Sequence, residues 1–396
     1  MTRIRRILGA ILHQSMIAQA VTAAAALATV AFLARGMSTP DYAQYSVVTA
    51  LWAIGNAVVG TGTGTRIAKM SAEGSTRIKF KASELCIASA AAIVVGAYVG
   101  LMRGSTLDAV LSGLCMLAFV LAESSTSFEI GAGRFNRYLV LIGSRALAPM
   151  ALLGALFIVG GLNFTTAVAS VLAANIIALA LWPTRWGFSI ERAVGISSHS
   201  IGAMNMALWI IASADRLVLE RIVEPVDLAT YALAYGLVDR VYRSLSNAYI
   251  ARHLGASFQG SALKIRATYF AGTMVLGVLL VPTVSWGSSF LSGGRYVPDL
   301  VVSSLVVGAG LFMTWCAPYY LRLMATGTYK TSLILVSSLA SINLVGNFLI
   351  DGFLGIVGAA YLSMLTYALW FAWLTNRRPG YRMRQRMIGR HVRIPA

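Results

Sequence analysis

The sequence predicts an all-α polytopic membrane protein, and its composition and length support that prediction. Hydrophobic residues make up 58% of the 396 residues, and charged residues make up only 12%. Soluble domains carry about 25% charged residues, so this chain lacks the polar residues that a water-exposed surface requires. One membrane span with its connection takes about 30 to 35 residues, and the length therefore predicts about twelve transmembrane helices.

The expected spans follow one another with short connections, which leave no room for a catalytic domain outside the membrane. Each is an apolar stretch long enough to cross a hydrocarbon layer of about 30 Å. We place them at 7–34, 44–65, 83–102, 107–131, 138–160, 164–182, 198–222, 227–250, 268–291, 297–321, 331–350 and 353–375.

Lysine and arginine are distributed unequally between the two sets of connections. With the N-terminus inside, 24 of the 32 Lys and Arg residues lie on the inner side, and the outer side holds Arg35, Arg103, Arg221 and Arg295. Cytoplasmic connections are enriched in Lys and Arg, so we expect both termini in the cytoplasm. This topology accounts for the net charge of +18 without a nucleic-acid partner, and the basic tail is expected to rest on anionic membrane lipids.

Two segments resemble each other at a separation of 186 residues (227 minus 41). Asp41-Tyr-Ala-Gln-Tyr45 aligns with Asp227-Leu-Ala-Thr-Tyr231, and each segment follows a proline. Six spans separate the two segments, so both run in the same direction through the membrane. The sequence therefore predicts two parallel six-helix lobes around a central cleft. We expect an N-terminal lobe at 1–190, a C-terminal lobe at 191–376 and a basic cytoplasmic tail at 377–396.

Motifs for metal, cofactor or ATP binding are absent from the sequence. The three cysteines and four histidines are scattered without the spacing of a metal site. Gly60-Thr-Gly-Thr-Gly64 lacks the Lys-Ser/Thr that follows the glycines of a phosphate-binding loop, and its spacing favours close helix packing. We therefore expect neither a cofactor nor a metal, and no enzymatic activity.

Ionisable residues inside the expected spans are the main candidates for function, because a charge in hydrocarbon is costly. Guanidinium groups suit phosphate through their planar set of donors and their permanent charge. The basic residues within spans are Arg145, Arg216, Arg240 and Arg243.

Acidic residues accompany these arginines, and each has two interpretations. Glu123 and Asp239 lie within reach of Arg145 and Arg243, and Glu220 lies one turn from Arg216. Such acids either form structural ion pairs or take part in coupling and gating. Glu123, Asp215 and Asp239 are our candidates for coupling or gating.

The expected span at 227–250 carries a polar, aromatic stripe. At 100° per residue, six side chains fall on one helix face: Tyr231, Tyr235, Asp239, Tyr242, Ser246 and Tyr249. The stripe must contact protein or water, and tyrosines offer rings and hydroxyls that suit sugars. It is either a substrate-binding surface or a buried polar seam. Arg240 points away from the stripe, toward the other lobe or a structural partner.

Four segments resemble Wzx-type polysaccharide flippases of the MOP superfamily, which also includes lipid II flippases and MATE multidrug exporters. The segment 34–45, ARGMSTPDYAQY, resembles the family's connection between the first two spans. The segment 215–220, DRLVLE, is similar to the start of the family's second lobe. The segment 343–350, NLVGNFLI, with 355–360, GIVGAA, is similar to its span 11–12 region. Gln44 and Met37 depart from the family pattern. The resemblance implies two six-helix bundles around a cleft, working by alternating access.

The resemblance and the arginines together predict a flippase in the bacterial cytoplasmic membrane. Its expected substrate is a lipid-diphosphate-linked oligosaccharide, moved from the inner to the outer leaflet for synthesis or export of surface polysaccharides such as exopolysaccharide or O-antigen. Its expected partners are this substrate, anionic lipids, and a polysaccharide polymerase or other envelope-assembly proteins. The substrate-binding candidates are Arg145, Arg216, Arg240, Arg243, Tyr231, Tyr235 and Tyr242.

Three other functions are also compatible with the sequence. A MATE-like exporter of small molecules, coupled to protons or sodium, would use an acidic cavity in the same architecture. A membrane glycosyltransferase or ligase, or an envelope-assembly scaffold without transport activity, belongs to a different class. The short outer connections argue against the enzymes.

Overall fold

The computed structural model is almost entirely helical, and it describes residues 14–181, 186–189, 196–258, 267–326 and 329–376. The expected basic tail at 377–396 lies outside the described residues. The helices are α2 (Gln14–Gly36), α3 (Thr39–Asn56), η1 (Ala57–Thr61, a π-helix), α4 (Gly62–Ala72), α5 (Ala82–Arg103), α6 (Thr106–Gly131), α7 (Phe135–Ile158), α8 (Phe164–Leu181), α9 (Ile196–Ile222), α10 (Pro225–Phe258), α11 (Ala267–Ser292), α12 (Leu300–Thr326) and α13 (Tyr329–Asn376). Two short strands are β1 (Ile78–Lys81) and β2 (Trp186–Ser189).

The described helices match the twelve expected spans once two irregular ones are taken into account. The axis of α3 bends by 48° where η1 leads into α4, so these elements form one broken span. Within α13, Gly355 has a φ of 54°, a left-handed conformation that glycine adopts without strain, and it divides the helix into two segments. Eight described helices are long and apolar enough to cross a membrane, or nine with the bent pair. The predicted all-α membrane fold is confirmed.

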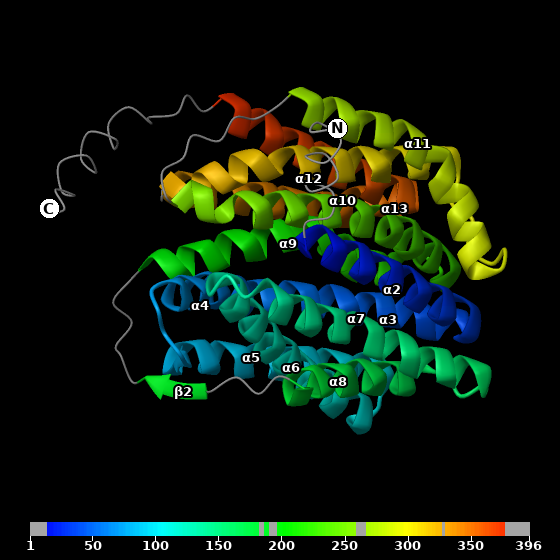
Figure 1. The fold of residues 1–396 in the computed structure, drawn as a ribbon. Coiled ribbons are helices and arrows are strands. Elements are labelled where there is room, and N and C mark those ends of the chain that lie inside the picture. Colours follow the sequence, from blue (N-terminus) through cyan, green and yellow to red (C-terminus); the bar gives the residue numbers. More distant parts are fainter. Residues whose placement is uncertain (1–13, 182–185, 190–195, 259–266, 327–328, 377–396) are drawn as a thin grey trace, which may run out of the picture.

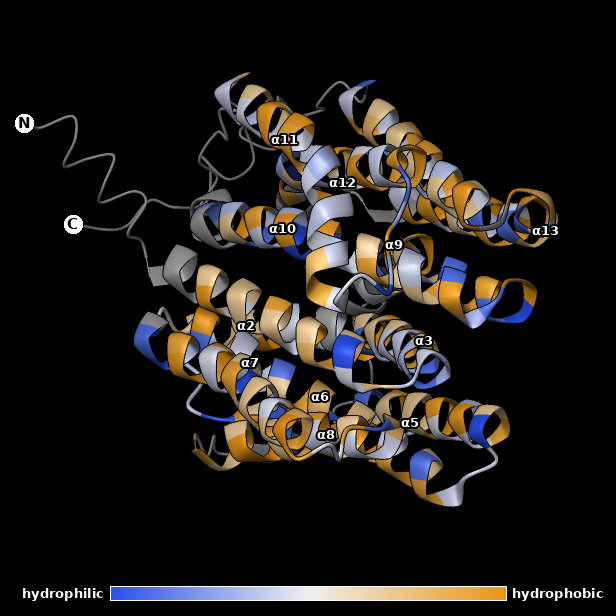
Figure 2. Ribbon diagram, turned by 90° about the vertical axis from the view of Figure 1, so that its right-hand side faces the viewer, coloured by the Kyte–Doolittle hydropathy of each residue, from blue (hydrophilic) through white to orange (hydrophobic). Residues whose placement is uncertain are grey.

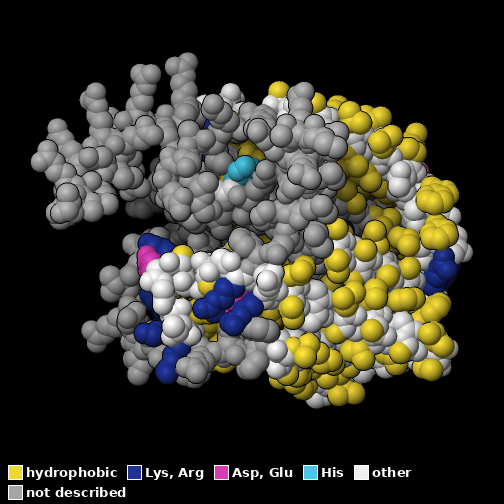
Figure 3. Space-filling view, in the orientation of Figure 1, with side chains coloured by type: hydrophobic (Ala, Val, Ile, Leu, Met, Phe, Trp, Pro, Cys, Tyr) yellow, Lys and Arg dark blue, Asp and Glu magenta, His cyan; other side chains and the backbone are white. Residues whose placement is uncertain are grey.

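The exterior of the helices is apolar. Large side chains such as Ile93, Val278 and Phe353 are exposed at 71%, 65% and 89%. Figure 3 shows hydrophobic side chains over the right-hand part of one face, while Lys and Arg side chains gather toward the lower left, near the place of α4 in Figure 1. Such a surface is stable in lipid and not in water. The chain is therefore a multi-pass membrane protein.

The helices form two groups, which we call the N half (α2 to α8) and the C half (α9 to α13). In Figures 1 and 2, α10 to α13 lie above and α3 to α8 lie below, with α2 and α9 along the boundary. The halves meet where α2 and α3 pack against α10, and where α3, η1 and α4 pack against α9. The lobe boundary near residue 190 stays a prediction, because the linker around it is only partly described.

The two ends of the helix bundle differ in what they carry. We call the end where α2 ends and α3 begins the Arg35 end, and the opposite end, where α4 leads toward α5, the Arg66 end. At the Arg66 end, β1 pairs in parallel with β2, with Ile78 opposite Trp186, and the ring of Phe80 stacks on that tryptophan. The strand pairing attaches the segment after α8 to the N half.

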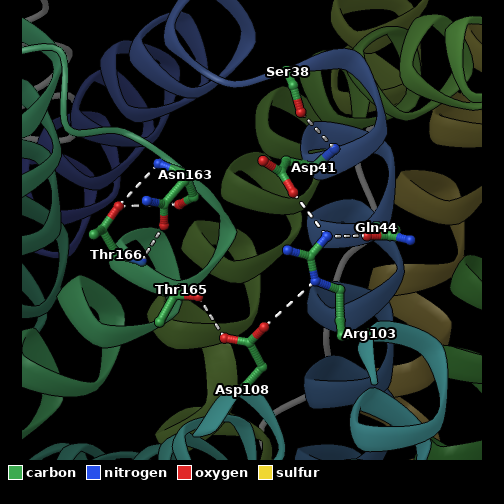
Figure 4. A network of polar contacts seen from close by, with 8 residues as sticks. All are labelled: Ser38, Asp41, Gln44, Arg103, Asp108, Asn163, Thr165 and Thr166. Atoms are coloured by element: carbon green, nitrogen blue, oxygen red, sulfur yellow. Dashed lines mark hydrogen bonds and ion pairs between the residues drawn. The ribbon is translucent and has the colours of Figure 1, made fainter. Parts of the chain in front are cut away.

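At the Arg35 end, one polar network ties four helices of the N half together (Figure 4). Arg103, at the end of α5, donates to Asp41 of α3 at 2.8 Å and lies 3.5 Å from Asp108 of α6. Thr165 of α8 donates to the same Asp108 at 2.6 Å. Asp108 is only 2% exposed, so this pairing satisfies a buried carboxylate. The N half is thereby a well-braced unit at this end.

Close glycine contacts occur where the sequence predicted helix packing. A Cβ on Gly64 would lie 2.7 Å from the Ser127 hydroxyl oxygen of α6. A Cβ on Gly202 of α9 would lie 2.9 Å from the carbonyl oxygen of Val58 in η1. The packing interpretation of the Gly60–Gly64 segment is confirmed at Gly64. Gly202 adds a second close contact, between the two halves.

Candidate functional site

The tyrosine stripe of α10 lies largely within the core of the C half. Tyr231 and Tyr242 are both 0% exposed, and Tyr235 is 4% exposed. The Tyr242 ring packs against Gly310 of α12, and Tyr249 packs against Tyr269 of α11. The buried-seam interpretation therefore describes most of the stripe, and Tyr231 and Tyr242 do not form an open sugar-binding surface in this conformation.

Asp215 is the centre of a buried polar group between α9, α10 and α13. Its carboxylate accepts hydrogen bonds from the Tyr231 hydroxyl and from the Ser363 hydroxyl, the latter at 3.4 Å. It also accepts from the backbone N–H of Arg216 at 2.7 Å. Asp215 is 0% exposed, so these donors satisfy a carboxyl group that has no contact with water.

Asp351 extends this group and was not among the candidates from the sequence. Asp351 was expected in the connection between two spans, and it lies one turn before Gly355, where α13 divides into two segments; its side chain is nevertheless 1% exposed. Among the described residues, neither of its carboxylate oxygens has a hydrogen-bond partner. Asp215 lies within electrostatic range of it. The spacing of Asn343, Asn347 and Asp351, four residues apart on one helix face, was the signal that could have identified it.

Two of the four candidate arginines are paired within their own half, as the sequence predicted. Arg145 donates to Glu123 at 2.9 Å, and its guanidinium lies over the ring of Phe119 at 4.8 Å. Arg243 forms three hydrogen bonds to Asp239, the shortest at 2.6 Å, and lies 3.9 Å from the centroid of Trp209. Their charges and donors are largely satisfied by these neighbours.

Among the residues that the structure describes, Arg216 forms no such ion pair. The predicted pairing with Glu220 is absent, because Glu220 accepts from Tyr98 of α5 at 3.2 Å and lies 3.8 Å from Arg221. The Arg216 guanidinium lies over the ring of Tyr235 at 5.2 Å, and its buried Nε has no hydrogen-bond partner among the described residues. A buried guanidinium donor without an acceptor is unusual and costly.

Arg240 likewise has no carboxylate within ion-pair distance among the described residues. Its Nη1 donates to the carbonyl oxygen of Gly236, one turn earlier in α10, at 2.8 Å. Tyr42 and Tyr45 of α3 lie within electrostatic range of it. Arg240 therefore points toward the N half, which is one of the two directions that the sequence allowed.

Arg216 and Arg240 lie together at the contact between the two halves. Leu233 and Leu237, on the Arg240 side of α10, belong to the hydrophobic cluster of the N half. Tyr235 packs in a second cluster with Ala43 and Val47 of α3. The two guanidiniums act on each other electrostatically. Asp239, which acts on both, is bound to Arg243, and Asp215 acts on Arg216. The contact therefore holds excess positive charge.

The structure thus divides the candidate residues into separate groups. Arg216, Arg240 and Tyr235 lie at the contact between the halves, and Arg243, further along α10, is bound to Asp239. Tyr231 and Asp215 belong to the buried group around α13. Arg145 and Glu123 pair with each other within the N half.

Comparisons with known proteins support the fold. No model of a known protein family matches the sequence, and no curated protein matches it. An inward-facing structure of a multidrug resistance MATE family transporter of the MOP superfamily is similar, with a TM-score of 0.55, 14% identity, and coverage of 94% of this chain and 96% of the other. An outward-facing structure of such a transporter gives a TM-score of 0.54 and 14% identity, with 96% of both chains covered.

A structure of a MATE protein in complex with Br-NRF gives a TM-score of 0.50 at 13% identity, again over 96% of both chains. Similarity at this level of identity extends to the arrangement of helices and not to the substrate. These transporter structures match the chain over nearly its whole length, and their fold has been captured in both inward-facing and outward-facing conformations. The chain therefore has the fold of MOP-superfamily transporters.

Proposed function

We propose that this protein moves a lipid-diphosphate-linked oligosaccharide across the membrane by alternating access, and that Arg216 and Arg240 bind its diphosphate. The observation that carries the proposal is the pair of guanidiniums at the contact between the halves, neither of them bound to a carboxylate among the described residues. A passage between two rocking halves must run along this contact.

The chemistry of the two arginines favours an anionic ligand. Burying a guanidinium without acceptors is unfavourable, and a phosphate would supply the acceptors that Arg216 Nε lacks. Paired phosphates match two neighbouring guanidiniums, because each presents a planar fork of N–H donors. Arg145 and Arg243 are less suited to this role, since Glu123 and Asp239 already occupy their donors.

The apolar exterior fits a substrate whose lipid tail stays in the bilayer. Only the charged sugar-diphosphate portion then requires a polar path. We place the Arg66 end in the cytoplasm, following the excess of Lys and Arg there. Moving two negative charges outward across an inside-negative potential releases about 4 to 5 kcal/mol per 100 mV, which gives transport a direction without ATP.

A second candidate function is cation-coupled export of small molecules, and one observation favours it. Asp351 is buried with both carboxylate oxygens unpartnered among the described residues, close to Asp215. Two carboxylates in such a position suit a proton or a sodium ion, because a bound cation would relieve their repulsion. The same site is compatible with a flippase that uses cation coupling.

The test measures lipid-linked oligosaccharide reaching the outer leaflet in cells that depend on this protein. Arg216→Ala and Arg240→Ala are compared with Arg221→Ala, an arginine whose side chain is 69% exposed at the Arg35 end. We expect transport to fall at least tenfold in the first two variants and to stay normal in the third. Normal transport by all three at equal expression would remove the arginines from the mechanism.

A fourth variant, Asp351→Asn, distinguishes the two candidate functions. If the protein is a cation-coupled exporter, efflux of cationic dyes will depend on a proton or sodium gradient and on Asp351. Loss of dye efflux in Asp351→Asn, with lipid-linked oligosaccharide reaching the outer leaflet unchanged, would favour the exporter.

A further inference from the structure

Two arginines cross between the halves at the Arg35 end. Arg35, in the last turn of α2, donates through Nε to the carbonyl oxygen of Leu291 at 3.0 Å and through Nη2 to that of Phe290. Both carbonyls belong to the last turn of α11. The guanidinium also lies 5.6 Å from the centroid of the Phe290 ring. An arginine of the N half thus binds the end of a helix in the C half.

Arg295 makes the reciprocal contact from the C half. It lies in the connection that follows α11, and its Nη1 donates to the carbonyl oxygens of Ala34 at 3.1 Å and Met37 at 3.0 Å. Its Nη2 donates to the Thr39 hydroxyl at 2.9 Å. These acceptors lie at the end of α2 and the beginning of α3. Each half therefore places an arginine on the end of a helix in the other half.

Helix ends explain why these contacts are favourable. The last carbonyls of a helix lack intrahelical donors and carry partial negative charge, so they attract cations. The acceptors are nevertheless neutral, and Arg35 and Arg295 are exposed at this end. When the halves separate, water can solvate both the carbonyls and the guanidiniums. The contacts are thus specific and also easy to release.

Tyr296, next to Arg295, fills the space beneath the arginines. It is 1% exposed and packs in the hydrophobic cluster of the N half. Its ring stacks on Tyr42 with centroids 5.5 Å apart, and its hydroxyl lies 3.2 Å from the Thr39 hydroxyl. A residue of the C half is therefore inserted into the N half, which is braced there by the Arg103 network (Figure 4).

We propose that Arg35, Arg295 and Tyr296 form a latch that holds the Arg35 end closed and opens in each transport cycle. The contrast with Arg103 supports this role. Arg103 binds two carboxylates within one half, where no movement is required, whereas the latch uses neutral acceptors between halves that must separate. The latch depends on alternating access and is independent of which substrate is carried.

The test measures distances at both ends of the purified full-length protein in detergent or nanodiscs, without substrate. In a Cys86→Ser background, spin labels are attached to cysteines at Leu107 and Phe353, which are 60% and 89% exposed on the N and C halves near the Arg35 end. A second pair at Lys79 and Thr375 reports on the Arg66 end. Pulsed electron paramagnetic resonance gives the distance distributions.

The double variant Arg35→Gln/Arg295→Gln removes the charges of the latch and keeps side chains of similar length. We expect the longer-distance population at the Arg35 end to rise about fivefold or more, while the distances at the Arg66 end, where Gly202 already touches η1, stay unchanged. The control Glu224→Gln, which removes an exposed charge in the connection between α9 and α10 at the same end, is expected to leave both distributions unchanged. Unchanged distributions in the double variant would overturn the latch.

Two additional comparisons separate loss of the latch from misfolding and from loss of substrate binding. If the double variant does not elute as a single species, the single variants Arg35→Gln and Arg295→Gln supply the same comparison, and each is expected to shift the distribution in the same direction. Because no substrate is present, loss of the proposed diphosphate binding would leave this result intact. Conversely, normal diphosphate binding together with unchanged distances in the double variant would reject the latch and leave the proposed function intact.

Discussion

Arg145 and Arg243 differ from Arg216 and Arg240 in their surroundings, although all four lie in expected membrane spans. The first two bind Glu123 and Asp239 within their own half, at 2.9 and 2.6 Å. The other two lie where the halves meet, with no ion-pair partner among the described residues. A paired arginine joins two helices or two turns, whereas an unpaired one keeps its donors for a ligand. The surroundings, more than the residue type, indicate which arginines bind substrate.

The largest effect is expected from removing both unpaired arginines. Arg216→Met/Arg240→Met retains side chains of similar volume and removes the donors. A hydrogen bond to a charged group contributes about 1.5 to 3 kcal/mol, so we expect transport to fall by about 100-fold or more. Burying a charge without a partner is costly, so the unfolding temperature should stay equal or rise. Loss of both transport and folded protein would instead make the arginines structural.

Removing the acidic partner of a paired arginine should mainly lower the stability of the protein. Asp239→Asn leaves Arg243 without its carboxylate, and we expect the free energy of unfolding to fall by about 1 to 3 kcal/mol. This is less than the roughly 3 to 5 kcal/mol of a fully buried pair, because the two side chains are 28% and 20% exposed. Thermal unfolding in detergent measures the loss, and Asp239→Asn/Arg243→Gln should recover part of it. No destabilisation in the single variant would show that the pair is not structural.

Arg240→Lys sharpens the comparison by keeping the charge and removing the planar fork. Lysine cannot bind a phosphate through two parallel donors, so we expect about a tenfold loss of transport, between wild type and Arg240→Ala. The paired counterpart, Arg145→Lys, should lose little transport, because Glu123 can still be paired. Equal losses of transport in both variants would show that paired and unpaired arginines contribute equally to transport.

The smallest effect is expected at Gly202, where the halves touch near the Arg66 end. Its Cβ in Gly202→Ala would lie 2.9 Å from a backbone carbonyl oxygen of the other half, so the two helices must shift apart. We expect a loss of stability of about 1 kcal/mol and more frequent opening of this end. Gly272→Ala, where nothing lies within 4 Å, is the matched control. Identical behaviour of both variants would argue against tight contact at Gly202.

Local features of the site were predictable from the sequence, and contacts between distant segments were not. The Arg243–Asp239 pair follows from a spacing of four residues on one helix, and Glu123–Arg145 from two neighbouring spans. The failed pairing of Arg216 with Glu220 had the same spacing, but Tyr98 of another helix competes for that acid. Helical spacing therefore identifies possible pairs and cannot decide between competing partners.

In the fold, too, local features were predictable from the sequence and contacts between distant segments were not. The apolar stretches predicted the helices, because lipid imposes one length and one composition on every span. The bend at η1 and the pairing of β1 with β2 have no comparable signal in single stretches of sequence. The sequence identified Arg35 and Arg295 only as two of the outer arginines. It did not predict their contacts between the halves, because Arg35 and its acceptor in Leu291 lie 256 residues apart.

Direct binding of a polyprenyl diphosphate to the purified protein tests the central claim most closely. Wild type, Arg216→Gln, Arg240→Gln and the exposed control Arg221→Gln are titrated with the same ligand, and tryptophan fluorescence or calorimetry reports the Kd. The unpaired arginines are expected to bind the diphosphate, so each of the first two variants should raise the Kd by about tenfold or more, while Arg221→Gln matches wild type. Equal Kd values across all four proteins would contradict the account.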